Sequence, residues 1–207
     1  MTQAGPYHHA NLRQTLLDAA VALIGEVGPR AFTLREVARR AGVSHNAPYR
    51  HFASKDELLA EVAAEGFERL TVSMRKRMAR ANSPGERLQE CGCGYVAFAL
   101  RWPQHFLVMF DLPKVSDGQE KYQLAGENAF GVLRESIVAA QQSGDLPAGD
   151  PLPLTWMAWS FVHGIAKLAI SGNLPLSIRA TIEFTRTASL KIFRGMKADH
   201  TTLRSAD

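Results

Sequence analysis

The chain has 207 residues, 46% of them hydrophobic, so it can fill the core of one large domain or two small ones. It has neither an N-terminal signal-peptide pattern nor an apolar run of about 18 residues, so we expect a cytoplasmic protein that does not span a membrane. Its net charge of +4 lies entirely in residues 1–55, which hold seven basic and three acidic side chains, whereas residues 56–207 hold 17 of each. This uneven distribution favours a polyanionic partner such as nucleic acid.

Two short helices are predicted after a first helix over residues 12–27. Thr33 and Glu36 have the spacing of a capping box, in which each side chain binds the backbone N–H of the other residue. An apolar stripe at helical spacing follows, formed by Leu34, Val37, Ala38 and Ala41. Gly42 lies where a left-handed residue often ends a helix, and Ser44 is the N-cap of the next one. So tight a turn is typical of a helix-turn-helix, whose second helix enters the DNA major groove, although an ordinary corner between two helices has the same pattern.

The rest of the chain also has helical periodicity. Longer helices are predicted over residues 55–80, 84–101, 117–143, 152–171 and 176–196. A short helix at 104–110 follows a bend at Pro103, and the end segments 1–9 and 198–207 are expected to be loose. Because no alternating strand pattern of useful length occurs, the sequence predicts an all-α fold of about nine helices.

The two cysteines do not form a recognisable site. Cys91 and Cys93 lie two residues apart on a predicted helix, so their side chains point about 200° apart and cannot easily bridge each other. They also lack the further ligands of a zinc site. We interpret them as small buried thiols in a reducing compartment, and a redox sensor is the alternative.

Three segments resemble the N-terminal domain of the tetracycline-repressor (TetR) family. They are LRQTLLDAAVALIGEVG (residues 12–28), TLREVARRAGVS (33–44) and PYRHFASKDELL (48–59). The spacing of Tyr49, His51, Phe52 and Lys55 is the most specific part of this likeness. Pro48 departs from the family pattern, which usually has Leu or Ile there. As the fourth residue of the second short helix, Pro48 should cost one hydrogen bond and leave that helix intact.

A second likeness lies in the C-terminal half. The segment WSFVHGIAKLAISG (residues 159–172) resembles the C-terminal domain of a TetR subgroup that is marked by a Trp, a Val and a His-Gly pair. Together the two resemblances imply a DNA-binding domain over residues 10–70 and a ligand-binding and dimerisation domain over residues 71–200. The implied partners are a double-stranded DNA operator, a second copy of the chain and an unidentified small-molecule effector.

The expected DNA contacts are of two kinds. The candidates for reading base edges are Arg35, His45, Asn46 and Ala47. Asn46 can bind adenine through two hydrogen bonds, Arg35 can bind guanine, and the Ala47 methyl can meet a thymine methyl. The positions that match the family's phosphate contacts are Thr33, Ser44, Tyr49, His51 and Lys55. For His51, packing inside the domain is the alternative.

The last two predicted helices are the candidates for a dimer interface. The segment 152–171 is apolar nearly all round, which indicates central burial or an interface. The segment 176–196 has a stripe formed by Ile178, Ile182, Thr185, Ser189, Ile192 and Phe193. Packed against their symmetry mates, the two segments would form a four-helix interface. The competing interpretation is that both stripes close the monomer's own core.

Specificity for an effector is expected in the C-terminal half. The pocket candidates are Phe98, Trp102, Phe106, Met109, Phe110, Trp159 and His163, although for His163 the favoured interpretation is a satisfied core or interface histidine. These observations predict a repressor that a small apolar or amphipathic ligand releases from a near-palindromic operator. The alternative is a DNA-binding regulator or architectural factor without small-molecule input. No nucleophile elbow, phosphate loop or metal-ligand spacing occurs, so we expect no catalytic residues, no metal and no cofactor.

Overall fold

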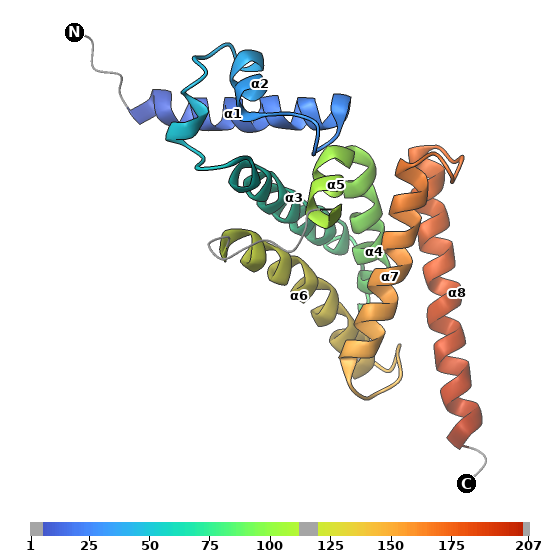
Figure 1. Ribbon diagram of the computed structural model, residues 1–207. Helices are drawn as coiled ribbons and strands as arrows, with labels where there is room; N and C mark the ends of the chain where they lie inside the picture. The colour runs from blue at the N-terminus through green and yellow to red at the C-terminus, as the bar shows by residue number, and fades with distance from the viewer. Residues whose placement is uncertain (1–5, 112–119, 205–207) are drawn as a thin grey trace. The chain divides into compact units, whose positions relative to one another are not determined.

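The structure, a computed structural model, describes residues 6–111 and 120–204, together with the side chains of residues 12–110, 120–193 and 195. These residues form eight α-helices and one short 3-10 helix, with no strand among them (Figure 1). This confirms the predicted all-α fold. No helix in this part of the chain has both the length and the apolar character that crossing a membrane requires.

The chain divides into two compact units. Unit 1 contains α1 (Pro6–Val27), α2 (Leu34–Arg40), η1 (Pro48–Arg50), the first half of α3 (Lys55–Met78), α5 (Pro103–Asp111) and the first residues of α6 (Glu120–Gln142). Unit 2 contains the remainder of α3 and α6 together with α4 (Pro84–Arg101), α7 (Pro151–Ile170) and α8 (Ile178–Arg204).

Local signals place most helix ends where the sequence predicted them. Pro84 opens α4 behind Ser83, whose hydroxyl accepts a hydrogen bond from the backbone N–H of Glu86 at 3.2 Å. Pro103 opens α5 after the expected bend. The loose ends were predicted wrongly where the structure describes them, because α1 already begins at Pro6 and α8 continues to Arg204. Residues 1–5, 117–119 and 205–207 lie outside the described part of the chain.

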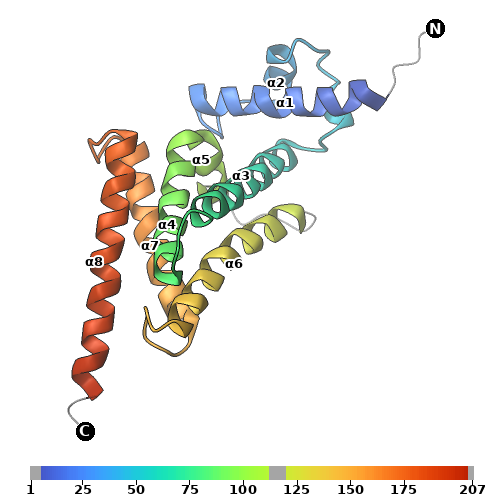
Figure 2. The same cartoon turned by 180° about the vertical axis from the view of Figure 1, so that it is seen from behind.

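Unit 2 is built around α4, which packs against both α7 and α8. Both views show α7 and α8 side by side and running in opposite directions (Figures 1 and 2). Glycines on α4 allow close contact with its neighbours. A Cβ atom at Gly92 would lie 3.1 Å from the side chain of Val162, and one at Gly94 would lie 2.6 Å from the Cα atom of Met74. The core of unit 2 therefore depends on the absence of side chains at these two positions.

Both cysteines are free and buried in unit 2. The Sγ atom of Cys91 lies 3.6 Å from the Sδ atom of Met74, whereas that of Cys93 lies 3.7 Å from the carbonyl oxygen of Ile182. The two thiols thus point to different neighbours, as their spacing predicted. Burial raises the pKa of Cys91 to about 12 and that of Cys93 to about 11. Because the thiolate is the reactive form, these values argue against a redox sensor.

Candidate nucleic-acid interface

α2 begins at the predicted capping box, which the structure confirms. The hydroxyl of Thr33 accepts from the backbone N–H of Glu36 at 3.3 Å, and the carboxylate of Glu36 accepts from the backbone N–H of Thr33 at 2.7 Å and from its hydroxyl at 2.9 Å. These hydrogen bonds from Thr33 hold the pKa of Glu36 below its usual value. The cap is therefore complete at neutral pH and weakens only as acid protonates the carboxylate.

The turn after α2 also has the predicted geometry. Gly42 has a φ of +69°, in the left-handed region. Its N–H donates to the carbonyl of Arg39 at 3.3 Å, and the N–H of Val43 donates to the carbonyl of Ala38 at 3.0 Å. This pair of hydrogen bonds is the Schellman motif, which ends α2 abruptly and sends the chain into the next element.

The second short helix was predicted wrongly, because the segment after this turn is not an α-helix. Only Pro48–Arg50 is helical, and it forms the single 3-10 turn η1. An α-helix that starts at Ser44 needs the N–H of residue 48 to bind the Ser44 carbonyl, and proline has no N–H. Instead the N–H of Ala47 donates to the Ser44 carbonyl at 2.9 Å. This shorter-range bond favours the tighter 3-10 winding over an α-helix.

Three of the four base-reading candidates are exposed. Arg35 lies on the first turn of α2, while His45 and Asn46 form the turn before η1. Ala47 retains only 8% of its surface exposed, so its methyl group is not presented for the predicted contact with a thymine methyl. Ala47 is the N-cap of η1, and its methyl group is buried. The surface available to a base edge is thus a short polar turn instead of one face of a helix.

The phosphate candidates differ in the exposure of their side chains and in the hydrogen bonds that these side chains already make. Thr33, Ser44 and Tyr49 are exposed, and the hydroxyl of Thr33 is already hydrogen-bonded within the capping box. The ammonium of Lys55 donates to the carbonyl of Arg30 at 2.9 Å and lies 4.4 Å from the centre of the Phe32 ring. Burial lowers the pKa of Lys55. An ammonium has three donors, so this arrangement orients Lys55 and leaves two N–H groups for an anion.

His51 is less accessible than the other phosphate candidates. Its ring is half-buried with its Nε2 atom out of contact with solvent, and its centre lies 6.4 Å from that of Phe52. This geometry fits the alternative interpretation, in which His51 packs inside the domain.

The seven pocket candidates fall into three groups. Phe106, Met109 and Phe110 lie on α5 in unit 1, where the rings of Phe106 and Phe110 are 5.0 Å apart. Phe98 and Trp102 lie on and directly after α4 in unit 2, with ring centres 5.6 Å apart. Trp159 and His163 lie on α7, also in unit 2. Among the described residues, no group of three His, Cys, Asp or Glu side chains is placed to hold a metal ion.

Trp159 and His163 share a hydrogen-bonded group with Tyr95, which the sequence analysis did not single out. The phenol oxygen of Tyr95 lies 2.9 Å from Nδ1 of His163 and accepts from Nε1 of Trp159 at 3.3 Å. Burial raises the pKa of Tyr95 far above its usual value, so the phenol stays protonated. His163 is thus hydrogen-bonded within unit 2, as the core interpretation requires. No local pattern could have identified Tyr95, because its partners lie 64 and 68 residues further along the chain.

Comparison with protein families gives two matches. The family described as bacterial regulatory proteins of the tetR family matches residues 16–62. The family described as the tetracyclin repressor-like C-terminal domain matches residues 88–189. Each match falls on a segment that the sequence analysis assigned to a TetR-like half.

Individual proteins show the same likeness. The HTH-type transcriptional repressor KstR2 of Mycobacterium tuberculosis is 38% identical over 77 residues, which are 37% of this chain and 38% of KstR2. Among solved structures, a protein of unknown function from Rhodococcus sp. RHA1 is 32% identical with a TM-score of 0.80, covering 93% of this chain and 98% of that one. The regulator FadR from Bacillus subtilis, solved with stearoyl-CoA, has a TM-score of 0.73 at 16% identity and covers 87% and 96% of the two chains. At that identity the likeness to FadR concerns the fold alone.

Proposed function

The chain belongs to the TetR family of bacterial transcriptional regulators, and from this premise we propose that it is a repressor that binds a near-palindromic operator as a homodimer. In this proposal a small apolar or amphipathic ligand releases the DNA, and the protein acts in the cytoplasm without catalysing a reaction. The observation that carries the DNA-binding part is the position of Asn46. This side chain is exposed on the turn between the Schellman motif and η1, beside the exposed His45.

The amide of Asn46 is suited to read adenine, because it can donate to N7 and accept from the N6 amino group of the base. We expect Asn46→Ala to weaken binding by about 1–3 kcal/mol on a duplex that the wild-type protein selects from a random library, and to have little effect on random duplex. Fluorescence anisotropy with both duplexes measures this difference. Asn128→Ala, at an exposed asparagine on α6, is the matched control. Equal losses on the two duplexes would make Asn46 a backbone contact.

The homodimer part of the proposal keeps α7 and α8 as the interface but changes the residues on α8. The predicted stripe was wrong at its centre, because Thr185 and Ser189 are 0% and 2% exposed and therefore belong to the core of the monomer. The hydroxyl of Thr185 is satisfied within the helix, since it donates to the carbonyl of Thr181 at 2.8 Å. For these residues the competing interpretation, closure of the monomer's own core, holds.

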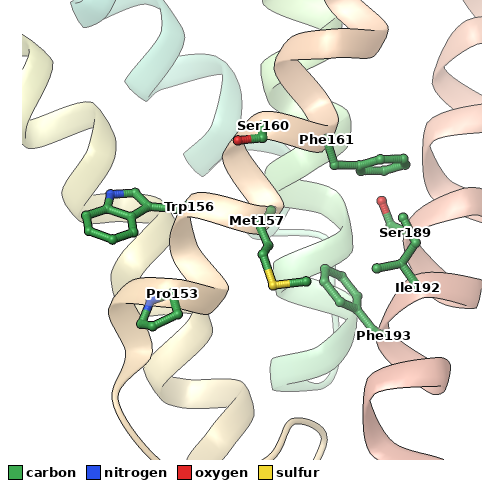
Figure 3. Close-up of a pocket in the computed structure, with 9 residues that line it drawn as sticks. Pro153, Trp156, Met157, Ser160, Phe161, Ser189, Ile192 and Phe193 are labelled. Atoms are coloured by element: carbon green, nitrogen blue, oxygen red, sulfur yellow. The ribbon is translucent and has the colours of Figure 1, made fainter.

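A different set of side chains supports the dimer. Seven of the eleven exposed large apolar side chains in the described part of the chain lie in or between α7 and α8. They are Trp156, Met157, Leu168, Leu176, Ile178, Phe184 and Leu190. A groove of about 520 Å³ also runs between the two helices. In Figure 3, Met157 and Phe161 point from α7 toward α8, and Phe193 points back toward α7, whereas Trp156 points away from α8. So much exposed apolar surface is typical of an obligate interface.

The ligand part of the proposal rests on the family and on what this fold can hold. FadR, which shares the fold, was solved with stearoyl-CoA, so a helical domain of this kind can accommodate an amphipathic molecule. The two-state mechanism requires that the ligand bind the DNA-free conformation more tightly than the DNA-bound one. The alternative is a DNA-binding regulator or architectural factor without small-molecule input, which a core filled by the side chains of the pocket candidates would favour.

A thermal-shift screen with fatty acids, acyl-CoA esters and lipophilic cations separates the two functions. We expect one of these compound classes to raise the melting temperature and, at the same concentration, to weaken binding to the selected duplex. The coupling free energy between the compound and the DNA duplex should be about 1–3 kcal/mol. A compound that stabilises the protein without changing its affinity for DNA is not an effector. If no compound in these classes weakens DNA binding, the alternative function is the better one.

A further inference from the structure

The positive charge of the helix-turn-helix is concentrated on a few arginines. Of the seven cations in residues 1–55, three are engaged within unit 1. Arg13 pairs with Glu61 at 2.8 Å, both guanidinium NH groups of Arg40 bind the carboxylate of Glu26, and Lys55 donates to a carbonyl. The other four guanidinium groups are exposed, and in the described part of the chain they make no ion pair or hydrogen bond. They are Arg30, Arg35, Arg39 and Arg50.

The three arginines of α2 lie on different sides of the helix. Successive residues of an α-helix are rotated by about 100°, so Arg35 and Arg39 lie about 40° apart on one flank of the buried stripe. Arg40 lies on the opposite flank, where its ion pair with Glu26 turns it toward α1. The hydrogen bonds between the two side chains raise the pKa of Arg40 and lower that of Glu26, so both groups are charged at neutral pH. Arg39 therefore shares the side of α2 that presents Arg35 to the solvent.

The 3-10 turn positions Arg50 in a comparable way. Ala47 and Pro48 are buried within unit 1, while Tyr49 and Arg50 are both exposed. η1 packs against α2, so Arg50 is held on the second element of the helix-turn-helix and Arg39 on the first. Guanidinium is the side-chain group best suited to phosphate, because its planar fork can form two parallel hydrogen bonds with one phosphate.

We propose that Arg39 and Arg50 bind phosphates of the DNA backbone on either side of the turn formed by His45 and Asn46, and that Arg40 does not. This inference rests on the proposed function of the helix-turn-helix. The competing explanation for Arg39 is that it only complements the C-terminal end of α2 and the nearby carboxylate of Glu36, whose pKa it helps to lower. That explanation predicts an effect on stability and none on the binding of DNA.

The salt dependence of binding to random duplex DNA tests this proposal, because each phosphate contact contributes about 0.9 to the slope of log K against log salt. We expect R39A and R50A each to flatten the slope by about 0.9, and R39A/R50A to flatten it by about 1.8. R39K should keep the wild-type slope because the ammonium still binds a phosphate. The matched control is R40A, which removes the same charge from the next residue of α2 and should keep the slope. Circular dichroism checks that each variant keeps its helix content.

The outcomes distinguish this inference from the function on which it rests. If the wild-type protein binds random duplex with a steep slope and R39A and R50A retain that slope, the inference is wrong and the DNA-binding function stands. If R40A flattens the slope as much as R39A, the losses reflect total charge and the assignment fails as well. A wild-type protein with no measurable affinity for any duplex overturns the proposed function itself.

Discussion

Met157→Glu is expected to convert the dimer into folded monomers and to abolish binding to the selected duplex. Met157 is 52% exposed in the monomer and lines the groove between α7 and α8 (Figure 3). A glutamate there remains hydrated in the monomer, so the fold should persist. In the dimer the carboxylate would be buried without a partner, at a cost of several kcal/mol. Sedimentation equilibrium measures the change in mass, and fluorescence anisotropy measures the loss of DNA binding. We expect this loss because a monomer has a single helix-turn-helix, which contacts too few base pairs for a specific site.

The matched control for this change is Val72→Glu. Val72 on α3 is 64% exposed and lies outside the surface that α7 and α8 present, so its glutamate variant should remain dimeric. Ile182, a member of the predicted stripe on α8, is less suitable for this test. It is half-buried, and its carbonyl contacts the thiol of Cys93, so a charge there would disturb the monomer as well. A Met157→Glu protein that stays dimeric would place the interface elsewhere on the surface.

Gly94→Ala is expected to destabilise the protein by about 1–3 kcal/mol, the usual cost of overpacking a core. A Cβ atom at Gly94 would lie 2.6 Å from the Cα atom of Met74 and 2.9 Å from the carbonyl oxygen of Ser73. Both atoms belong to the backbone of α3, so no rotamer change can relieve the contact. The two helices are also held together there, because the hydroxyl of Ser73 donates to the carbonyl of Gly94 at 2.8 Å. Urea unfolding measures the difference in the free energy of unfolding.

Gly131→Ala makes the same chemical change on α6 with the opposite expected sign. Nothing lies within 4 Å of a Cβ atom at Gly131. The substitution should therefore stabilise the protein by up to about 1 kcal/mol, through the higher helix propensity of alanine. A Gly94→Ala protein as stable as the wild type would show that α3 and α4 are further apart than this contact requires.

The sequence by itself determined the features that depend on neighbouring residues. The capping box of Thr33 and Glu36, the left-handed Gly42 and the proline that opens α4 all act within a few residues, so their spacing was sufficient to predict them. The segment from Ser44 to Arg50 shows where reasoning from neighbouring residues was insufficient. Pro48 was treated as the loss of a single hydrogen bond, yet the bond it loses is the one that would have joined Ser44 to a first α-helical turn.

Only the tertiary structure decided which surfaces meet. The stripe on α8 is real as a periodicity, but periodicity does not say whether α4 or a second copy covers it. Thr185 and Ser189 are both buried, and Thr185 can pack in a core because its hydroxyl donates to the backbone carbonyl of Thr181 in its own helix. Gly94 is a similar case, because a glycine in a helix looks the same in the sequence whether it faces solvent or a helix backbone. Contacts between residues far apart in the chain leave no local pattern, and these contacts formed the core and left the apolar surface of α7 and α8 exposed.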